Sequence, residues 1–152
     1  MIPCAYIFDI DGTLADCSQR LHFIQQEKRD WDNFYNAMVN DKPIPDVQGV
    51  LFRLSDSGAK ILFVTGRPEK YRKQTVEWLK RFTVINLDDI DKFLYMRKDG
   101  DHREDYIVKR EIYENMIKDN FYIYGVFEDR EQCVNMWRDK GLTCFQVSNG
   151  KY

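Results

Sequence analysis

The sequence predicts an α/β fold in which helices cover both faces of a central parallel sheet of about five strands. Short, almost continuous apolar runs alternate along the chain with longer segments of helical periodicity. Strands that are apolar at nearly every position are typical of parallel sheets, because both faces of such a sheet are buried. The 152 residues suffice for one domain with a hydrophobic core, so we expect a single domain over residues 1–152.

The first part of the chain predicts one strand followed by two helical regions. Residues 4–8 are apolar enough for a buried strand, and residues from about 18 to 40 are rich in aromatic side chains, for which we expect a helical conformation. Pro43 and Pro45 end that region, and a helix follows that stops at Ser57-Gly58. The connection to the next strand is too long for one crossover helix, so residues from about 16 to 45 are predicted to form a small helical cap.

Four further apolar runs predict the other strands of the sheet. These are residues 61–64, 92–96, 122–127 and 143–147. A helix through Trp78 follows the first of them, and a helix through Trp137 precedes the last. Between the strands at 92–96 and 122–127 we expect a polar loop at 97–103 and a helix from 104 to about 118. The side chains expected to face inward from that helix are Tyr106, Val108, Ile112 and Met116.

Composition excludes several classes of protein. An apolar content of 43%, a charged content of 32% and a net charge of −2 describe a soluble globular protein with no overall attraction to nucleic acid. There is no charged leader and no apolar run of membrane-spanning length, so we expect no membrane association. The cysteines form no C-x-x-C pair, which makes zinc an unfavoured ligand and predicts free thiols in the cytoplasm. They are Cys4, Cys17, Cys133 and Cys144.

Two carboxylates follow the first strand directly. Asp9 and Asp11 are two residues apart, and Gly12 and Thr13 come next. Side chains at this spacing share one face of a strand, so both acids can address one ligand. Because adjacent carboxylates repel each other unless a cation or a shared proton intervenes, the pair indicates Mg²⁺ binding or acid/base chemistry. The alternative interpretation is a solvated Asp-Gly turn.

Other polar residues are predicted at the same edge of the sheet. The carboxyl ends of parallel strands meet at one edge, where ligands bind in open α/β sheets. The residues in this position are Thr65, Gly66, Arg67, Glu128 and Asp129, with Lys109 on the helix after the third strand. A carboxylate nucleophile, a hydroxyl and a lysine for phosphoryl oxygens, and acids for Mg²⁺ form a consistent set for phosphoryl transfer.

The order of these residues resembles the haloacid dehalogenase superfamily of phosphatases, which have a Rossmann-like fold. The matching motifs are Asp9-x-Asp11-Gly12-Thr13, Thr65-Gly66, Lys109 and Glu128-Asp129. The resemblance implies that Asp9 attacks phosphorus and becomes an aspartyl-phosphate, while Asp11 protonates the leaving oxygen and then activates water. It further implies that Thr65 and Lys109 bind phosphoryl oxygens.

The resemblance also implies a metal site. Mg²⁺ would be held by Asp9, the backbone carbonyl of Asp11, and Asp129. Glu128 stands where the superfamily usually has aspartate, and it is a further candidate metal ligand. The cation reduces the repulsion between the attacking carboxylate and the phosphate.

A narrower resemblance is to the phosphatase domain of phage-type polynucleotide kinase/phosphatase, which removes 3′-phosphates from nucleic acid ends. The similar segments are 9–20, 64–67, 97–109 and 127–137. In that family Arg20 and Arg67 match positions that contact substrate phosphate, and Asp105 matches a position linked to Lys109 or the metal shell. The sequence has no G-x-x-x-x-G-K-[ST] phosphate loop, so we expect any kinase or ligase to be a separate partner.

The loop at 97–103 could guide a polyanionic substrate. It carries Arg97, Lys98, His102 and Arg103, and we interpret Arg97 and Arg103 as substrate contacts; a solvated charged surface is the alternative. We expect the aromatic residues of the cap to pack against one another rather than stack on bases. They are Trp31, Phe34 and Tyr35.

The sequence therefore predicts a Mg²⁺-dependent phosphatase acting on 3′-phosphate ends of DNA or RNA. The alternatives are a 5′(3′)-nucleotidase or general small-molecule phosphatase with the same chemistry, and a phospho-accepting or DNA-end-binding module without turnover. In receiver-type modules the phosphorylated aspartate follows the third strand, whereas Asp9 follows the first. The sequence gives no indication of oligomeric state.

Overall fold

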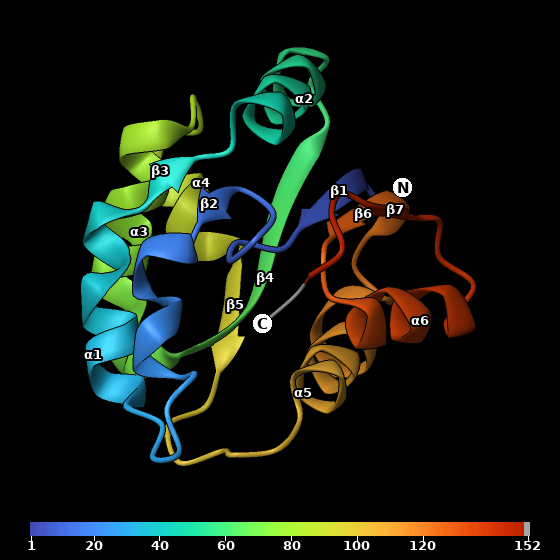
Figure 1. Ribbon diagram of the computed structural model, residues 1–152. Helices are drawn as coiled ribbons and strands as arrows, with labels where there is room; N and C mark the ends of the chain where they lie inside the picture. Colours follow the sequence, from blue (N-terminus) through green and yellow to red (C-terminus); the bar gives the residue numbers. More distant parts are fainter. Residues whose placement is uncertain (151–152) are drawn as a thin grey trace.

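The computed structural model describes residues 1–150, except for the side chain of Leu87. Five parallel strands form the central sheet in the order β5-β4-β1-β6-β7, which confirms the predicted fold class (Figure 1). The strands are β1 (Cys4–Phe8), β4 (Lys60–Pro68), β5 (Leu94–Arg97), β6 (Tyr122–Glu128) and β7 (Cys144–Gln146). The predicted single domain ends at residues 151–152, which lie outside the described part of the chain.

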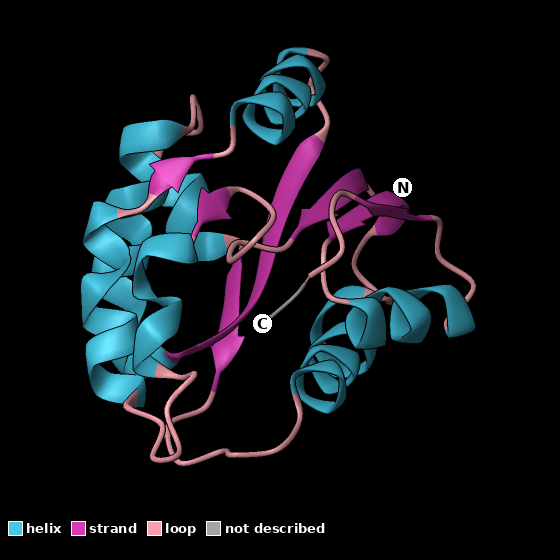
Figure 2. Ribbon diagram, viewed as in Figure 1, coloured by secondary structure: helices cyan, strands magenta, loops and turns pink. Residues whose placement is uncertain are grey.

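Helices cover both faces of the sheet, as predicted (Figure 2). One core contains α2 (Pro45–Asp56), α3 (Arg72–Phe82) and α4 (Leu87–Lys92), which contribute Leu51, Leu79 and Ile90 to it. The other core contains α5 (Asp105–Ile112) and α6 (Glu131–Asp139), whose Val108 and Trp137 are buried against the opposite face. Both cores pack against the faces of the sheet. The strands therefore hold the polar residues at the carboxyl edge in fixed positions.

The segment at 18–40 forms short helical turns rather than a continuous helix. They are η1 (Ser18–Phe23), α1 (Trp31–Asn36) and η2 (Ala37–Asn40). The interruption at 24–30 is polar, and Asp30 ends it by accepting a hydrogen bond from the amide of Asn33 at the start of α1. A two-stranded antiparallel sheet of β2 (Ala15–Asp16) and β3 (Lys42–Pro43) ties the two ends of this segment together.

Two predicted elements have different boundaries in the structure. Lys92, predicted as strand, is the last residue of α4, a helix that was not predicted and that Asn86 caps through the amide of Asp89. The helix predicted over 104–118 is α5 followed by a π-helical turn at Tyr113–Ile117. Such a turn adds a residue to the helical repeat and rotates the residues after it about the helix axis. The prediction that Met116 faces inward is therefore wrong: Met116 is 51% exposed and Ile117 is buried.

Two negative expectations concern membranes and disulfides. Within residues 1–150 no helix has both the length and the apolar character needed to cross a bilayer. The four cysteines, all in the described part of the chain, are free thiols as predicted.

Candidate active site

The sheet register brings the candidate residues together at its carboxyl edge. Phe8 at the end of β1 lies beside Phe63 of β4 and Phe127 of β6. The amide of Asp9 extends this pairing by donating to the carbonyl of Phe127 (3.0 Å). Asp9, which directly follows β1, therefore lies next to Glu128, the last residue of β6.

Lys109 of α5 is the cation at the centre of this site. Its Nζ lies 2.8 Å from Asp9 Oδ1, 2.8 Å from Glu128 Oε2 and 3.3 Å from Asp105 Oδ2, and the residue is almost completely buried. Burial by itself would lower the pKa of Lys109, but the surrounding carboxylates, Asp105 first, raise it well above its usual value. Lys109 is thus a fixed ammonium that holds Asp9 and Asp105 in place.

Asp9, Glu128 and Asp129 form a buried cluster of carboxylates. One oxygen from each lies within 4.8 Å of the others. Thr13 Oγ1 donates to Asp9 Oδ2 (2.9 Å) and lies 3.3 Å from Asp129 Oδ1. Burial, with the charge of Asp9 second, raises the pKa of Asp129 to about 7, and the same two causes raise the pKa of Glu128. Two neighbouring acids with raised pKa values indicate that the charge of Lys109 does not fully balance the negative charge of the cluster.

The donor atoms of this cluster fit Mg²⁺. Asp129 Oδ2 is buried and accepts no hydrogen bond from the residues described, which leaves one oxygen of the cluster with nothing to satisfy it. Hard oxygen ligands are those that Mg²⁺ prefers, and it is commonly held by one or two carboxylates. Asp9, Glu128 and Asp129 each offer one oxygen that could bind such an ion.

Glu128 is already engaged by the protein through both of its carboxylate oxygens. Oε2 accepts from Lys109, and Oε1 accepts from the backbone amides of Asp129 (3.2 Å) and Arg130 (3.4 Å). Its longer side chain therefore reaches back across the start of α6 while it also pairs with Lys109. Glu128 therefore helps to hold the Lys109 ammonium in place, in addition to being a member of the carboxylate cluster.

Asp11 lies in a second cluster, which is dominated by arginines. Its Oδ1 is 2.5 Å from Arg20 Nη2 and 2.6 Å from Arg67 Nη2. Both arginines are fully buried, and Asp41 pairs with Arg20 from the other side. Burial raises the pKa of Asp11, but the charges of Arg20 and Arg67 outweigh it, so that the pKa lies well below its usual range. Asp11 is ionised and restrained by two cations.

Asp41 is a member of this cluster that was not predicted from the sequence. Its two oxygens accept from Arg20 Nε (3.0 Å to Oδ1) and Nη2 (2.7 Å to Oδ2), and its backbone carbonyl accepts from Trp78 Nε1. The Arg20 guanidinium also lies over the ring of Phe34, 4.3 Å from its centroid. Asp41 lies between a helical turn and Lys42-Pro43 and belongs to no recognisable sequence motif. Its role follows only from its pairing with Arg20, which is distant in the sequence.

The aromatic residues of α1 pack against one another, as predicted. The rings of Trp31 and Phe34 lie 5.6 Å apart, and those of Phe34 and Tyr35 lie 5.2 Å apart. Phe34 is buried, whereas Trp31 remains partly exposed at the outer end of the cluster. This packing holds in place the Phe34 ring over which the Arg20 guanidinium lies.

The remaining predicted residues are Thr65 and Gly66 of β4 and Arg97, the last residue of β5. Thr65 is buried, and its Oγ1 accepts from the amide of Arg67 (3.2 Å). The carbonyl of Gly66 accepts from Arg97 Nε (2.8 Å), and Arg97 Nη2 lies 3.4 Å from Asp105 Oδ1. Arg97 therefore pairs with the same Asp105 carboxylate that pairs with Lys109.

Gly12 and Arg103 have contrasting positions. Gly12 has a φ of 79°, a left-handed conformation that favours glycine and that turns the chain sharply after Asp11. Arg103 lies on the outer surface, where its guanidinium pairs with Asp101 (2.9 Å) and Glu111 (2.7 Å). The structure thus brings Gly12 to the reaction centre but does not direct Arg103 at it.

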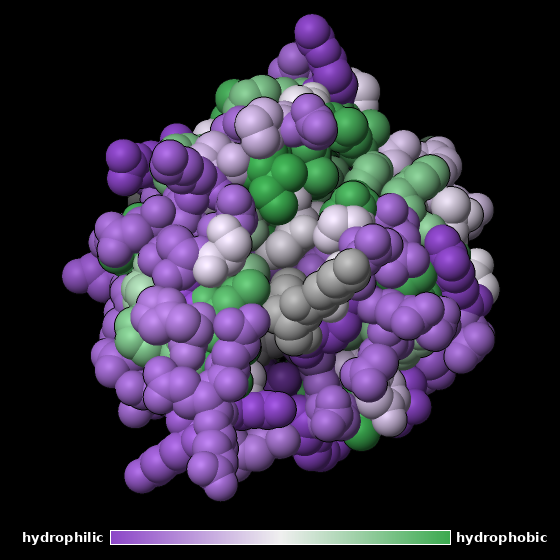
Figure 3. Space-filling view, in the orientation of Figure 1, coloured by the Kyte–Doolittle hydropathy of each residue, from purple (hydrophilic) through white to green (hydrophobic). Residues whose placement is uncertain are grey.

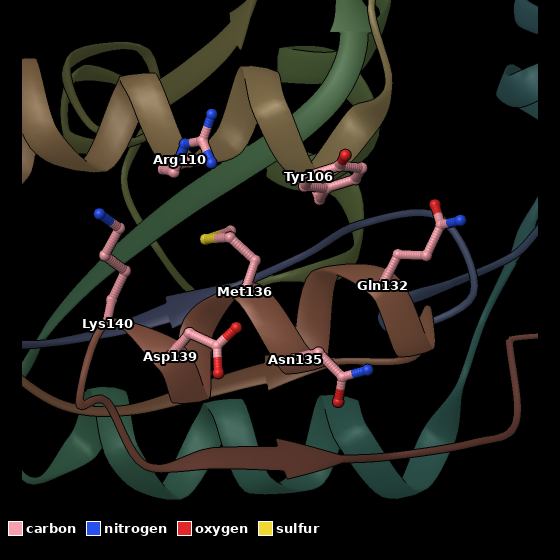
Figure 4. A pocket seen from close by; sticks show the side chains of 7 residues that line it. All are labelled: Tyr106, Arg110, Gln132, Asn135, Met136, Asp139 and Lys140. Atoms are coloured by element: carbon pink, nitrogen blue, oxygen red, sulfur yellow. The ribbon is translucent and has the colours of Figure 1, made fainter.

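The surface of residues 1–150 includes two hollows of different size. The one beside the site has a volume of about 220 Å³, and its wall includes Gly12, Cys17, Val47, Asp129 and Val147. A larger hollow of about 490 Å³ lies between α5 and α6 (Figure 4). It contains none of the candidate residues. Its lining residues are Tyr106, Arg110, Gln132, Asn135, Met136, Asp139 and Lys140.

Comparison with known proteins points to one family. Residues 3–152 match the family described as the polynucleotide kinase PNKP phosphatase domain. The "Putative bifunctional polynucleotide kinase/RNA ligase" of Autographa californica nuclear polyhedrosis virus is 29% identical over 148 residues, which are 95% of this chain and 19% of the viral protein.

Solved structures agree with this assignment. A chain of the structure described as the Pnkp1/Rnl/Hen1 complex superposes with a TM-score of 0.82 and 31% identity over 99% of this chain and 48% of that chain. The class C acid phosphatase from Bacillus anthracis shares the fold, with a TM-score of 0.74 and 13% identity over 100% of this chain and 69% of that chain. The chain spans less than half the length of the viral relative and of the complex subunit that it matches.

The family match covers nearly the whole chain, and the candidate carboxylates and lysine meet at the sheet edge where such enzymes place their sites. The chain belongs to the family of polynucleotide kinase PNKP phosphatase domains and is a phosphoric monoester hydrolase of the haloacid dehalogenase type.

Proposed function

We propose that the chain removes 3′-phosphates from the ends of nucleic acids, in a Mg²⁺-dependent reaction that passes through a phosphorylated Asp9. The observation that carries the proposal is the restraint on Asp9. Lys109 lies on one of its carboxylate oxygens and Thr13 donates to the other, with both contacts buried at the end of β1. A carboxylate so oriented is a nucleophile that loses little freedom on reaction.

The cation would be held by Asp9, Asp129 and the backbone carbonyl of Asp11, and would reduce the charge repulsion between Asp9 and the phosphate. An oxygen of Asp9 attacks phosphorus, and the bond to the ester oxygen breaks. Lys109 and the Thr65 hydroxyl are the donors for phosphoryl oxygens. Glu128 and Asp105 keep the Lys109 ammonium in position for this task.

Asp11 is proposed to move the proton. Without substrate its pKa is low because Arg20 and Arg67 face its carboxylate. An incoming phosphate competes for these two cations, which raises the pKa of Asp11 and favours the protonated form. Asp11 then gives its proton to the leaving oxygen, and in the second step takes one from the water that hydrolyses the acyl phosphate.

The cap and the partners are parts of the same proposal. We propose that residues from about 16 to 45 form a small cap that leaves the site open to a nucleic acid end. The names of the relatives include a polynucleotide kinase and an RNA ligase, which supports a kinase or ligase that acts with this phosphatase in the same chain or in a partner. We also propose a cytoplasmic location, which the free thiols support.

The test compares substrates under identical conditions. The protein with Mg²⁺ is given oligonucleotides with a 3′- or a 5′-phosphate, nucleoside monophosphates and an aryl phosphate. We expect the highest kcat/KM for the 3′-phosphorylated oligonucleotide. Equal or faster turnover of free mononucleotides would instead assign the site to a nucleotidase.

Variants test the chemistry separately from the substrate. Asp9→Asn is expected to abolish hydrolysis of every substrate, because an amide cannot attack phosphorus. Asp119→Asn is the matched control, since Asp119 is an exposed carboxylate after the π-helical turn. Retained activity in Asp9→Asn would exclude the aspartyl-phosphate route.

A further inference from the structure

Five aromatic side chains form a continuous surface on the sheet face against which α2 packs, and we call them the aromatic strip. They are Tyr6, Tyr122, Tyr124, Phe127 and Phe145. α2 packs with β4 and β1 in the core on this side, whereas the rings on β6 and β7 extend beyond it. Tyr122, Tyr124 and Phe145 remain 63%, 53% and 49% exposed. Figure 3 shows apolar surface between α2 and the β6–β7 side of the sheet.

The rings of the strip contact one another from one end to the other. Their centroids are 5.4 Å apart for Tyr122 and Tyr124, 5.8 Å for Tyr124 and Tyr6, and 6.4 Å for Tyr6 and Phe127. Phe127 and Phe145 stack at 5.1 Å, with 23° between their planes. Each ring is thus supported by a neighbour, which holds its outer surface in a fixed position.

A glycine lets one ring lie flat on the sheet. A Cβ at Gly125 would lie 2.9 Å from Phe145 Cε2 and 3.5 Å from Tyr6 Cδ1. Any larger residue at this position would lift the Phe145 ring off β6. A β-bulge between β1 and β6, where Ala5 pairs with Ile123 and Tyr6 with Gly125, leaves Tyr124 as the extra residue on the same side.

The strip leads directly to the reaction centre. β6 carries Tyr122, Tyr124 and Phe127 and ends at Glu128, beside Asp129. On β7, Phe145 is followed two residues later by Val147, which lines the 220 Å³ hollow together with Asp129. At the rise of a strand, the distance from Tyr122 to Glu128 is roughly 20 Å, enough for a few nucleotides.

We propose that the aromatic strip binds the single-stranded nucleotides that precede the terminal phosphate, with their bases stacked on Phe145, Tyr124 and Tyr122. The proposal rests on the proposed function. Exposed rings on a sheet face stack two or three bases in known single-strand binders, and this stacking tolerates any base sequence. The hollow beside Asp129 would take the terminal nucleoside, and the strand would leave along β6 and β7.

Direct binding tests this proposal without catalysis. The probe is a short oligothymidylate with no phosphate at its 3′ end, and binding is followed by quenching of tyrosine fluorescence and by anisotropy of a labelled strand. Phe145→Leu and Tyr124→Leu keep apolar contact with the sheet but remove the stacking ring. We expect each to weaken binding roughly tenfold. Phe145→Trp keeps a ring and should retain the affinity.

Met116→Leu is the control, because Met116 is similarly exposed but lies on the π-helical turn next to the opposite core. It should bind the oligonucleotide with unchanged affinity. Unchanged affinity in both strip variants overturns the proposal. So does a result in which these variants instead abolish self-association or binding of another protein, which would assign the strip to a protein interface.

Kinetics separate this inference from the proposed function. Phe145→Leu should raise KM for a 3′-phosphorylated oligonucleotide by about the same factor as it weakens binding, with KM and kcat for an aryl phosphate unchanged. If the wild-type protein hydrolyses 3′-phosphates but the variant has the same KM, the strip proposal fails alone. If the strip binds oligonucleotides but no 3′-phosphate is removed, the proposed function fails alone.

Discussion

Arg20 and Asp41 form a two-point ion pair in which both side chains are fully buried, with Nε 3.0 Å from Oδ1 and Nη2 2.7 Å from Oδ2. The same Nη2 lies 2.5 Å from Asp11 Oδ1. Arg67 adds a second cation, 2.6 Å from Asp11 and 3.9 Å from Asp41. Two cations thus balance two carboxylates, and Asp41 is the anion that fixes the arginines on the side away from the reaction centre.

Replacing Asp41 with asparagine should destabilise the protein strongly. The change keeps the shape of the side chain but leaves two buried guanidinium groups with one carboxylate. Removing one partner from a buried ion pair typically costs about 3–5 kcal/mol, so we expect the free energy of unfolding to fall by this order. Urea denaturation measures it, and turnover of an aryl phosphate should fall as well because Asp11 loses its fixed partners.

The control for Asp41→Asn is Glu111→Gln. Glu111 pairs with Arg103 at the surface, where both side chains are about half exposed. An exposed pair of this kind contributes little to the free energy of unfolding, because solvent screens it. Equal effects of the two substitutions on the free energy of unfolding would contradict the structural role assigned to Asp41.

The stability of the metal-free protein should decrease between about pH 4 and pH 7. The pKa of Asp129 rises from 3.8 to about 7 in the folded state, mainly through burial and then through the charge of Asp9. Between these values the folded state holds a proton that the unfolded state has lost, so the free energy of unfolding falls as the pH rises. Asp129 contributes at most on the order of 4 kcal/mol to this fall, and Glu128, whose pKa is also raised, adds to it in the same direction. Asp11 acts in the opposite direction, but only below its usual pKa of 3.8.

Urea denaturation with a chelator at pH 4.5 and pH 7.5 measures this difference. Asp129→Asn should make the difference smaller, because the amide does not titrate, and what remains is attributed to Glu128, whose pKa is also raised. Adding Mg²⁺ should stabilise the wild-type protein more at pH 7.5 than at pH 4.5, since the ligands must lose their protons to bind. A stability that rises steadily from pH 4.5 to 7.5 in the presence of chelator would contradict the assignment.

The sequence was informative about residues that follow apolar strands directly. Asp9 and Asp129 could be placed at one sheet edge because parallel strands end there together, and Lys109 could be added from its place after the third strand. Asp41 could not be placed in this way, because only the fold of residues 18–43 brings it to its partner Arg20. Arg103 was interpreted as a substrate contact from its charge alone. No feature of the neighbouring sequence indicated that it pairs instead with Glu111 of α5, eight positions later.

The π-helical turn explains why Met116 was wrongly predicted to face inward. Substitutions at Met116 and Ile117 test the position of this turn. A regular repeat directs Met116 inward, but the turn at Tyr113–Ile117 buries Ile117 instead. Ile117→Ala should lower the free energy of unfolding by about 2–5 kcal/mol because it leaves a cavity in the core. Met116→Ala should change it by less than about 1 kcal/mol. A larger loss for Met116→Ala than for Ile117→Ala in urea denaturation would mean that the helix is regular throughout.

Gly66 offers a test of the support behind Lys109. A Cβ at Gly66 would lie 2.0 Å from Asp105 Oδ1 and 3.4 Å from Arg97 Nη2. In Gly66→Ala the Asp105 carboxylate must move, which disturbs its pairing with both Arg97 and Lys109. We expect a destabilisation of about 1–3 kcal/mol, typical of overpacking, together with a lower kcat for an aryl phosphate.

Gly49→Ala is the matched control, because the added methyl group would meet nothing within 4 Å on α2. Alanine is the better helix former by about 1 kcal/mol, so Gly49→Ala should leave activity unchanged and raise the free energy of unfolding slightly. The two glycine substitutions therefore should change stability in opposite directions although they add the same atom. Wild-type kcat and stability in Gly66→Ala would show that Asp105 moves freely, and that Lys109 is held by Asp9 and Glu128 alone.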